Sequence, residues 1–236
     1  MKTLYIRKTA LLCLFTIAFG LSVHAQQSKT ISLNNFTGVA VSAGIELLIT
    51  QGSTESAKIV AEKDIIDEVV VQQSGSTVNV KWKQSWGINK MWKNKSAKVY
   101  ITYKKLNSIS ASSGSSVKTQ NTLKTGELET AVSSGASINA NISCNNLQVT
   151  SSSGASINLN GTATNVEVSS SSGSSVDAMG LASQYARVST SSGAGVEVNV
   201  AKGLETTTSS GGSIQYKGAA ALKNNSAKHS GVSKVD

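Results

Sequence analysis

A stretch rich in tryptophan and lysine is the most promising place for ligand chemistry in this sequence. Residues 81–95 hold all three tryptophans, eight lysines lie between 81 and 105, and no acidic residue occurs from 69 to 126. Indole faces combined with ammonium groups suit sugar rings, anionic polysaccharide or lipid head groups. The candidate ligand-binding residues are therefore Trp82, Trp86, Trp92, Lys83, Lys90 and Lys93.

The same stretch also has a purely structural interpretation. It interrupts the strand pattern of its surroundings, so we expect it to form a projecting loop. In a protein built of stacked coils, its tryptophans would instead cover the open end of the stack or a sheet edge. Its lysines would then be solvated side chains that discourage edge pairing. The sequence leaves both interpretations open.

Two carboxylates form a second, weaker candidate. Asp177 and Glu197 each stand four residues after the glycine of a recurring Ser-Ser-Gly tripeptide. If the repeats stack, the two side chains lie on adjacent coils, where such a pair could hold Ca²⁺ or act as a glycosidase pair. The equivalent positions in other repeats are only polar, and no third acidic residue shares the register. A solvated polar face is therefore the preferred interpretation, and we predict no metal site.

The recurring serines do not indicate a nucleophile. A catalytic serine needs one activated hydroxyl, a base and a group that orients the base. Beyond residue 25 the only histidine is His229, and the six Ser-Ser-Gly tripeptides are equivalent to one another. Phosphate-binding, zinc-binding and EF-hand patterns are absent from the sequence, so we expect no cofactor.

The tripeptide instead marks a structural repeat. Its glycine stands at 114, 135, 154, 173, 193 and 211, and a weaker His-Ser-Gly follows at 231. The intervals from 114 to 231 span 117 residues, a mean of 19.5. Three residues after each of the six glycines stands a β-branched apolar residue: Val117, Ile138, Ile157, Val176, Val196 and Ile214.

Apolar and polar residues alternate on both sides of each tripeptide, as in strands with one buried face. Leu147 and Val149 flank Gln148, and Val166 and Val168 flank Glu167. We therefore predict an all-β, right-handed parallel β-helix, or β-solenoid, with coils of about 19–20 residues. Ser-Ser-Gly would form its corners, with glycine at positive φ and the serine hydroxyls stacked as ladders. Arg187 would lie between Glu167 and Glu205 of the neighbouring coils.

The first 25 residues have the features of a secretory signal peptide. Lys2, Arg7 and Lys8 precede an apolar run over 11–21, and Val23-His24-Ala25 forms a small-residue cleavage site. The net charge of +9 falls to +6 after cleavage, because those three cations are lost and all 13 acidic residues remain. Cys144 is then the one remaining cysteine, and we expect it to be a small buried hydrophobe.

Export sets the expected location and partners. We predict a periplasmic, cell-surface or extracellular protein without a transmembrane segment after cleavage. Nucleic acid is an unsuitable partner for such a protein. The predicted divisions are a signal peptide at 1–25, an irregular solenoid region with the Trp/Lys-rich loop at 26–108, and the regular repeat region at 109–236. An uncapped solenoid end would also permit homo-oligomers.

The order of these motifs resembles a known bacterial family. Phe36-Thr37-Gly38-Val39 leads to the run from Gly44 to Gly52, and Val78-Asn79-Val80, Val99–Tyr103 and the Ser-Ser-Gly coils follow. Over about residues 30–220 this is similar to the head GIN domain family of adhesin-like proteins. The resemblance implies a β-helical fold, export and an adhesin or cell-envelope role, and it brings no catalytic residues.

Three hypotheses for function follow. The first is an exported, non-catalytic solenoid that presents a surface to an envelope polysaccharide, a glycan or a protein partner. The alternative is a polysaccharide-active β-helix enzyme, either a hydrolase or a lyase, which would need acidic and basic side chains converging in a groove. The third is a periplasmic protein that docks a partner through a strand edge or the Trp/Lys-rich loop.

Overall fold

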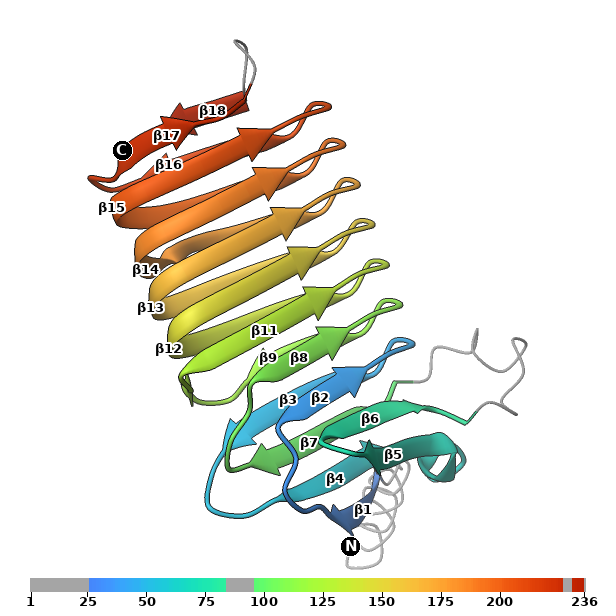
Figure 1. The fold of residues 1–236 in the computed structure, drawn as a ribbon. Helices are drawn as coiled ribbons and strands as arrows, with labels where there is room; N and C mark the ends of the chain where they lie inside the picture. The colour runs from blue at the N-terminus through green and yellow to red at the C-terminus, as the bar shows by residue number, and fades with distance from the viewer. Residues whose placement is uncertain (1–25, 84–95, 227–230, 236) are drawn as a thin grey trace, which may run out of the picture.

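The chain folds into a flattened, right-handed β-solenoid, as predicted (Figure 1). The computed structural model describes residues 26–83, 96–226 and 231–235. In this part of the chain a single 3₁₀ turn, η1 (Ile66–Glu68), accompanies the strands. Neighbouring regular coils are offset by 18 to 21 residues, since Ser137 pairs with Ser116 and Ser156, and Gly195 pairs with Ser175 and Ser213.

Each regular coil is one long strand that bends in the middle. These strands are β12 (Ser137–Ser151), β13 (Ser156–Ser170), β14 (Ser175–Thr190) and β15 (Gly195–Thr208). Inward and outward residues alternate along both arms, and Asn145 and Asn146, which are both exposed, mark the bend of β12. The bend lets one strand contribute to both faces of the flattened solenoid.

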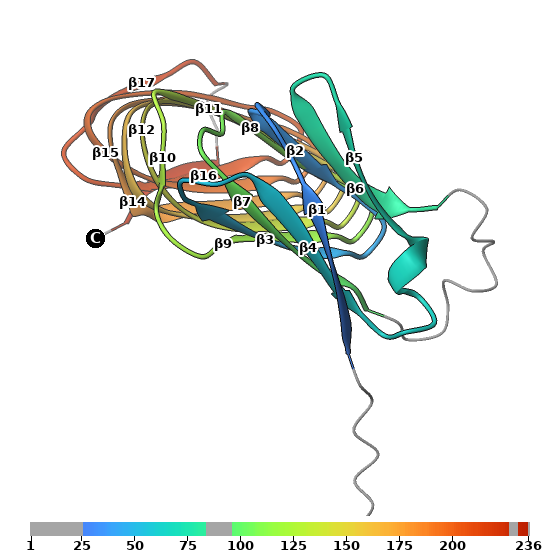
Figure 2. The ribbon, with the colours of Figure 1, turned by 90° about the horizontal axis from the view of Figure 1, so that it is seen from below.

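The two arms build two facing walls, seen end-on in Figure 2. Wall A contains β9 (Ser116–Thr119), the first arms of β12–β15, which precede the bend, and β16 (Ser213–Lys217). The short strand β10 (Leu123–Lys124) pairs with Ile142 and Ser143 of β12. Wall B contains β8 (Ser108–Ala111), β11 (Glu127–Val132), the second arms and β17 (Ala221–Asn224). The last strand, β18 (Gly231–Lys234), pairs with β16.

The Ser-Ser-Gly corners are tight turns joined by backbone hydrogen bonds. Ser134 and Gly135 both have positive φ, 55° and 69°, and Ala136 N donates to Ser133 O at 3.1 Å, which is the pattern of a type I′ turn. Gly135 N also donates to Ser153 O of the next coil at 3.1 Å, and the corners at Gly114, Gly154, Gly173 and Gly193 repeat this bond. Backbone groups therefore join the corners of successive coils, whereas the prediction assigned this ladder to serine hydroxyls.

The dry interior lies between the two walls. Every member of the β-branched column that follows the corners is at most 2% exposed, as the repeat predicted. Cys144 is buried and free, also as expected, and burial raises the pKa of its thiol. Small residues such as Ala136 and Ala155 fill the space just inside each corner, where the walls converge.

The order of the first coils in space differs from their order in the chain. β2 (Gly38–Val41) lies between β6 (Thr77–Trp82) and β8, and β3 (Glu46–Gln51) lies between β7 (Lys98–Tyr103) and β9. Glu46 links these three coils, because its carboxylate lies 3.1 Å from Lys98 Nζ and 3.3 Å from Lys118 Nζ. The bond from Lys98 is the main reason that the pKa of Glu46 is lowered.

Antiparallel strands close the N-terminal end of the stack. β1 (Gln27–Ser32) pairs with β4 (Ser56–Ala61), β4 pairs with β7, and β5 (Val69–Ser74) pairs with β6, all antiparallel. Parallel pairing of neighbouring coils therefore does not extend to this end. The tight connection between β5 and β6 allows only antiparallel pairing of these two strands, because parallel strands need a long crossover between them.

Three glycine-to-alanine variants test the backbone geometry. A Cβ on Gly161, whose φ is 112°, would collide with the carbonyl oxygen of Ile142, so we expect a loss of roughly 3 kcal/mol. Gly154 has φ of 69° with open space around its Cα, so Gly154→Ala should cost about 1 kcal/mol. Gly126→Ala, with neither constraint, should change stability by less than about 0.5 kcal/mol.

The measurement is the free energy of unfolding in urea for the three variants and the wild type. Equal stability of the Gly161 and Gly126 variants would contradict the close approach of β13 to β12 at Gly161.

Candidate functional site

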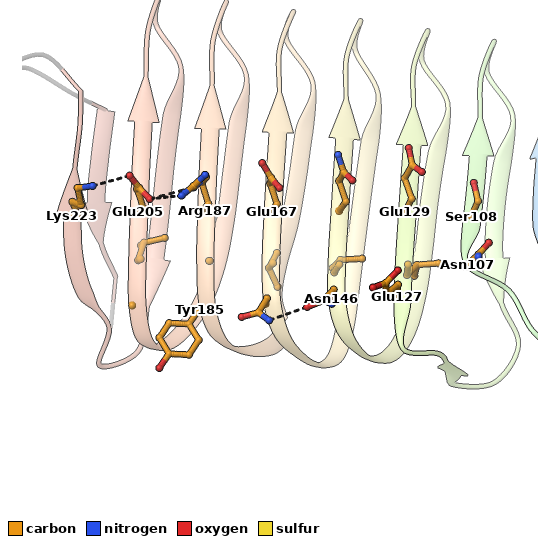
Figure 3. A pocket seen from close by; sticks show the side chains of 18 of the residues that line it. Asn107, Ser108, Glu127, Glu129, Asn146, Glu167, Tyr185, Arg187, Glu205 and Lys223 are labelled. Carbon is orange, nitrogen blue, oxygen red and sulfur yellow. Dashed lines mark hydrogen bonds and ion pairs between the residues drawn. The ribbon is translucent and has the colours of Figure 1, made fainter.

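A groove of about 840 Å³ runs across the outer face of wall B, perpendicular to the strands (Figure 3). Two rows of outward side chains line it, and the backbone of a buried row, which includes Leu147 and Val166, lies between them. The charged column consists of Ser108, Glu129, Gln148, Glu167, Arg187, Glu205 and Lys223. The bend column consists of Glu127, Asn146, Asn165, Tyr185, Gly203 and Ala221.

The fold places these residues without a dedicated loop. Charged-column and bend-column residues are two positions apart in each strand, so both point outward while the residue between them points into the core. Parallel pairing in register then repeats the pair on each coil. The groove is therefore a direct product of the repeat, and its chemistry is set by which residue each coil supplies.

One end of the charged column is an ion-pair network. Arg187 Nη2 lies 3.1 Å from Glu205 Oε2, and Lys223 Nζ lies 3.1 Å from Glu205 Oε1. Asn225 also donates to Oε1 at 2.7 Å. The hydrogen bonds from Lys223 and Asn225 lower the pKa of Glu205, which stays ionised. The predicted position of Arg187 between Glu167 and Glu205 is confirmed, but its ion pair is with Glu205.

The other end of the groove is acidic. Glu127, Glu129 and Glu167 are exposed on the outer face. Within the described part of the chain, none of these three carboxylates forms an ion pair. Figure 3 shows Glu129 and Glu167 standing in the same row as the paired Glu205. This end therefore presents negative charge that the protein itself does not neutralise.

The bend column supplies amides and one aromatic ring. Asn165 Nδ2 donates to Asn146 Oδ1 at 2.9 Å, so these amides are held in line along the groove. The side chain of Tyr185 is 48% exposed at the rim. Lys202 Nζ lies 5.7 Å from the ring centroid, and Gly203 leaves room for the ring on the next coil. A ring with polar neighbours is a suitable platform for a sugar.

The predicted Trp/Lys-rich site falls largely on residues that the structure does not describe. Trp86, Trp92, Lys90 and Lys93 lie outside the described residues. Lys83 is exposed directly after β6. Trp82 is half-buried against the core, and its indole Nε1 donates to Ala43 O at 2.8 Å. The Trp82 ring therefore contacts the corner of the neighbouring coil.

The carboxylate pair on wall A is adjacent, as the register predicted. Asp177 pairs with Glu197 across β14 and β15, and both are half-buried. Asp177 is already engaged, since it accepts hydrogen bonds from Asn158 Nδ2 at 3.2 Å and from Met179 N at 3.0 Å. Among the described residues, no three His, Cys, Asp or Glu side chains gather to hold a metal ion.

Sequence reasoning identified one side of the groove and missed the other. Aligning the coils showed the charged column, including Arg187 between acidic neighbours. The bend column was missed because no single residue type or charge is common to its members, which include Tyr185 and Asn146. What these residues share is their position, because each one directly precedes in sequence the buried-row residue of its strand.

The comparisons with known proteins agree with the fold. A model of the family described as "Putative auto-transporter adhesin, head GIN domain" matches residues 35–220. The chain belongs to the head GIN domain family. The resemblance found in the sequence is therefore confirmed. Among curated proteins, none matches this head GIN domain protein.

Solved structures of similar shape come from species of Bacteroides and Parabacteroides. A putative adhesin from Bacteroides fragilis superposes with a TM-score of 0.79 at 20% identity, covering 89% of this chain and 96% of its own. A putative adhesin from Parabacteroides distasonis has a TM-score of 0.72 at 18% identity, covering 90% and 98%. A putative lipid binding protein from the same species has a TM-score of 0.67 at 14% identity, covering 89% and 97%. At such identities the likeness shows a common fold.

In the ranges that the structure describes, no helix has the length and apolar character needed to cross a bilayer.

The ion-pair network makes a prediction about pH. Because the folded pKa of Glu205 is lowered, its charge stabilises the fold above the ordinary value of 4.5, and this contribution is lost as the pH falls through the lowered value. Glu205→Gln should therefore unfold at lower urea concentration than the wild type at about pH 7, and the difference should shrink at about pH 3. Glu167→Gln, without an ion pair, is the matched control and should show a much smaller change.

A second prediction concerns Trp82. Trp82→Phe keeps most of the ring but removes the hydrogen bond to Ala43, so we expect a loss of about 1 kcal/mol in the free energy of unfolding. Lys83→Ala, at the adjacent exposed position, should leave stability within about 0.5 kcal/mol of the wild type. If Trp82→Phe left the free energy of unfolding unchanged, the hydrogen bond from Trp82 Nε1 to Ala43 O would not stabilise the fold.

Proposed function

We propose that this head GIN domain protein is an exported, non-catalytic, adhesin-like binding protein that holds an extended ligand along the wall B groove. The observation that carries the proposal is the groove itself, in which the same pair of outward columns is repeated over successive coils. A surface that repeats at about 4.8 Å per coil suits a linear polymer, because several ligand units can make equivalent contacts.

Export is supported by the sequence and by the family. The positive segment, the apolar run over 11–21 and the small-residue cleavage site form a signal-peptide pattern. The family description contains the words auto-transporter adhesin, which refer to proteins outside the cytoplasm. A ligand of an exported adhesin-like protein is a component of an envelope, a matrix or another cell surface.

The contacts of Glu205 favour a binding role for this groove carboxylate over a role as a catalytic acid. A glycosidase needs one protonated carboxyl group with a raised pKa near an ionised one. Glu205, the groove carboxylate with the most partners, has a lowered pKa and is held ionised by Lys223, Asn225 and Arg187. Such a carboxylate cannot serve as a proton donor near neutral pH, although it can accept hydrogen bonds from a ligand.

The groove also favours a hydroxyl-rich ligand over an acyl chain. Its outward polar side chains are carboxylates, amides, a phenol and the cations Arg187 and Lys223, whereas the aliphatic residues of the buried row face the core. An acyl chain would leave these polar groups desolvated and without partners. The lipid named for the structurally similar Parabacteroides distasonis protein is therefore less suited to this groove than a polysaccharide.

Binding of linear polysaccharides tests the proposal. In affinity electrophoresis against a panel of soluble polysaccharides, we expect at least one to retard the wild type. Tyr185→Ala should weaken that binding about tenfold, in line with the loss of an aromatic anchor. Tyr100→Ala is the matched control, because Tyr100 is also exposed, at 40%, but lies on β7 of the other wall.

Two outcomes would count against the proposal. If Tyr185→Ala and Tyr100→Ala weakened polysaccharide binding equally, the groove would not be the binding site. Turnover of a bound polysaccharide, measured as new reducing ends and lost in Glu167→Gln, would establish the enzyme alternative in its place.

A further inference from the structure

We propose that the wall B groove selects an amino-sugar polymer, that is, a linear glycan whose repeating units carry free ammonium groups. This inference rests on the proposed function, because it names the chemical class of ligand for the same groove. It is carried by the charge of the groove side chains and by their spacing along the solenoid.

The backbone of the groove favours a glycan over a peptide. Proteins that bind an extended peptide on a sheet do so at an edge, where N–H and C=O groups are free to form a new ladder. The groove crosses β11, β12, β13, β14 and β15, each of which pairs with a strand on both sides. Only side chains are therefore offered to the ligand, and the polar ones are carboxylates, amides, a phenol and the cations Arg187 and Lys223.

The charge of the groove has the opposite sign to that of the chain. The groove is lined by four carboxylates and two cations, while the whole chain carries +9. Both of these cations, Arg187 and Lys223, are bound to Glu205. Glu127, Glu129 and Glu167 remain without an ion pair in the described part of the chain. Available carboxylates on an otherwise basic protein provide complementarity to a cationic ligand.

The spacing of these carboxylates suits a repeating cation. Glu129 and Glu167 stand in one column two coils apart, with Gln148 between them, which places them about 10 Å from each other along the axis. Glu127 stands beside Glu129 in the bend column of the same strand. Ammonium groups recurring along a polymer can therefore meet successive carboxylates, while Gln148 and Asn146 face its hydroxyl groups.

The two ends of the groove differ, which gives the ligand a preferred position. Arg187, Lys223 and Lys202 gather around β14, β15 and β17, and they would repel an ammonium group there. We therefore expect the amino groups to lie over β11 to β13. The Tyr185 ring, on the neighbouring coil, is available to stack against an adjacent sugar.

Three oligosaccharides with the same β-1,4-linked backbone and equal length test the inference. They differ at carbon 2, which carries a hydroxyl group, an acetamido group or an amino group. Binding to the full chain is measured by isothermal titration calorimetry at low salt and about pH 6. We expect the amino oligosaccharide to bind about tenfold more tightly than the other two, and added salt to reduce this preference.

Two variants test whether Glu129 and Glu167 cause the preference for the amino oligosaccharide. The double variant Glu129→Gln/Glu167→Gln should bind all three oligosaccharides equally, because it removes charge and preserves shape. Glu197→Gln removes a carboxylate from wall A and should keep the full preference.

The outcomes separate this inference from the proposed function. If the three oligosaccharides bind equally and Tyr185→Ala weakens all of them, the groove binds glycans and the amino preference is wrong. A preference that persists in the double variant would also overturn the inference. If none binds, the inference is wrong, and the polysaccharide panel alone decides the proposed function.

Discussion

Stacking of coils through parallel hydrogen bonds is the constraint on which the rest of this structure depends. A coil of about 19 residues with two short arms cannot bury its own apolar side chains, and it gains a dry interior only when another coil lies above and below it. The columns that include Ile138, Ile157 and Val176 are buried for this reason. The corner bonds from each glycine N–H to the next serine carbonyl keep the coils in register where the chain reverses direction.

The same constraint explains why antiparallel strands close the N-terminal end of the solenoid. A parallel stack leaves the hydrogen-bonding groups of its last strands open, and open edges invite association with other chains. The antiparallel strands β1, β4 and β5 cover the first coils and carry charged or polar side chains on their outer positions. Placing the β2–β3 coil inside the stack gives its strands a partner on each side.

Stacking also brings the outward residues of successive coils together into continuous surface columns. Because equivalent positions of successive coils lie side by side, a residue type repeated at one position becomes a column, and two columns enclose the groove on wall B. Charges in such a column are close enough to interact across coils, as Arg187, Glu205 and Lys223 do. A binding surface of this kind can change one coil at a time without altering the core, since outward residues alternate with inward ones.

The sequence alone was sufficient for the all-β class, the coil length, the buried β-branched column and the Arg187 neighbourhood, because these follow from local alternation and from a constant repeat. Only the tertiary structure decided the insertion of the β2–β3 coil between β6–β7 and β8–β9 and the antiparallel closure. These depend on contacts between segments far apart in the chain, for which the irregular N-terminal region carries no periodic signal. The groove also needed the structure, because Tyr185 and Asn146 belong to one column by position alone, and position becomes a surface only once the coils are stacked.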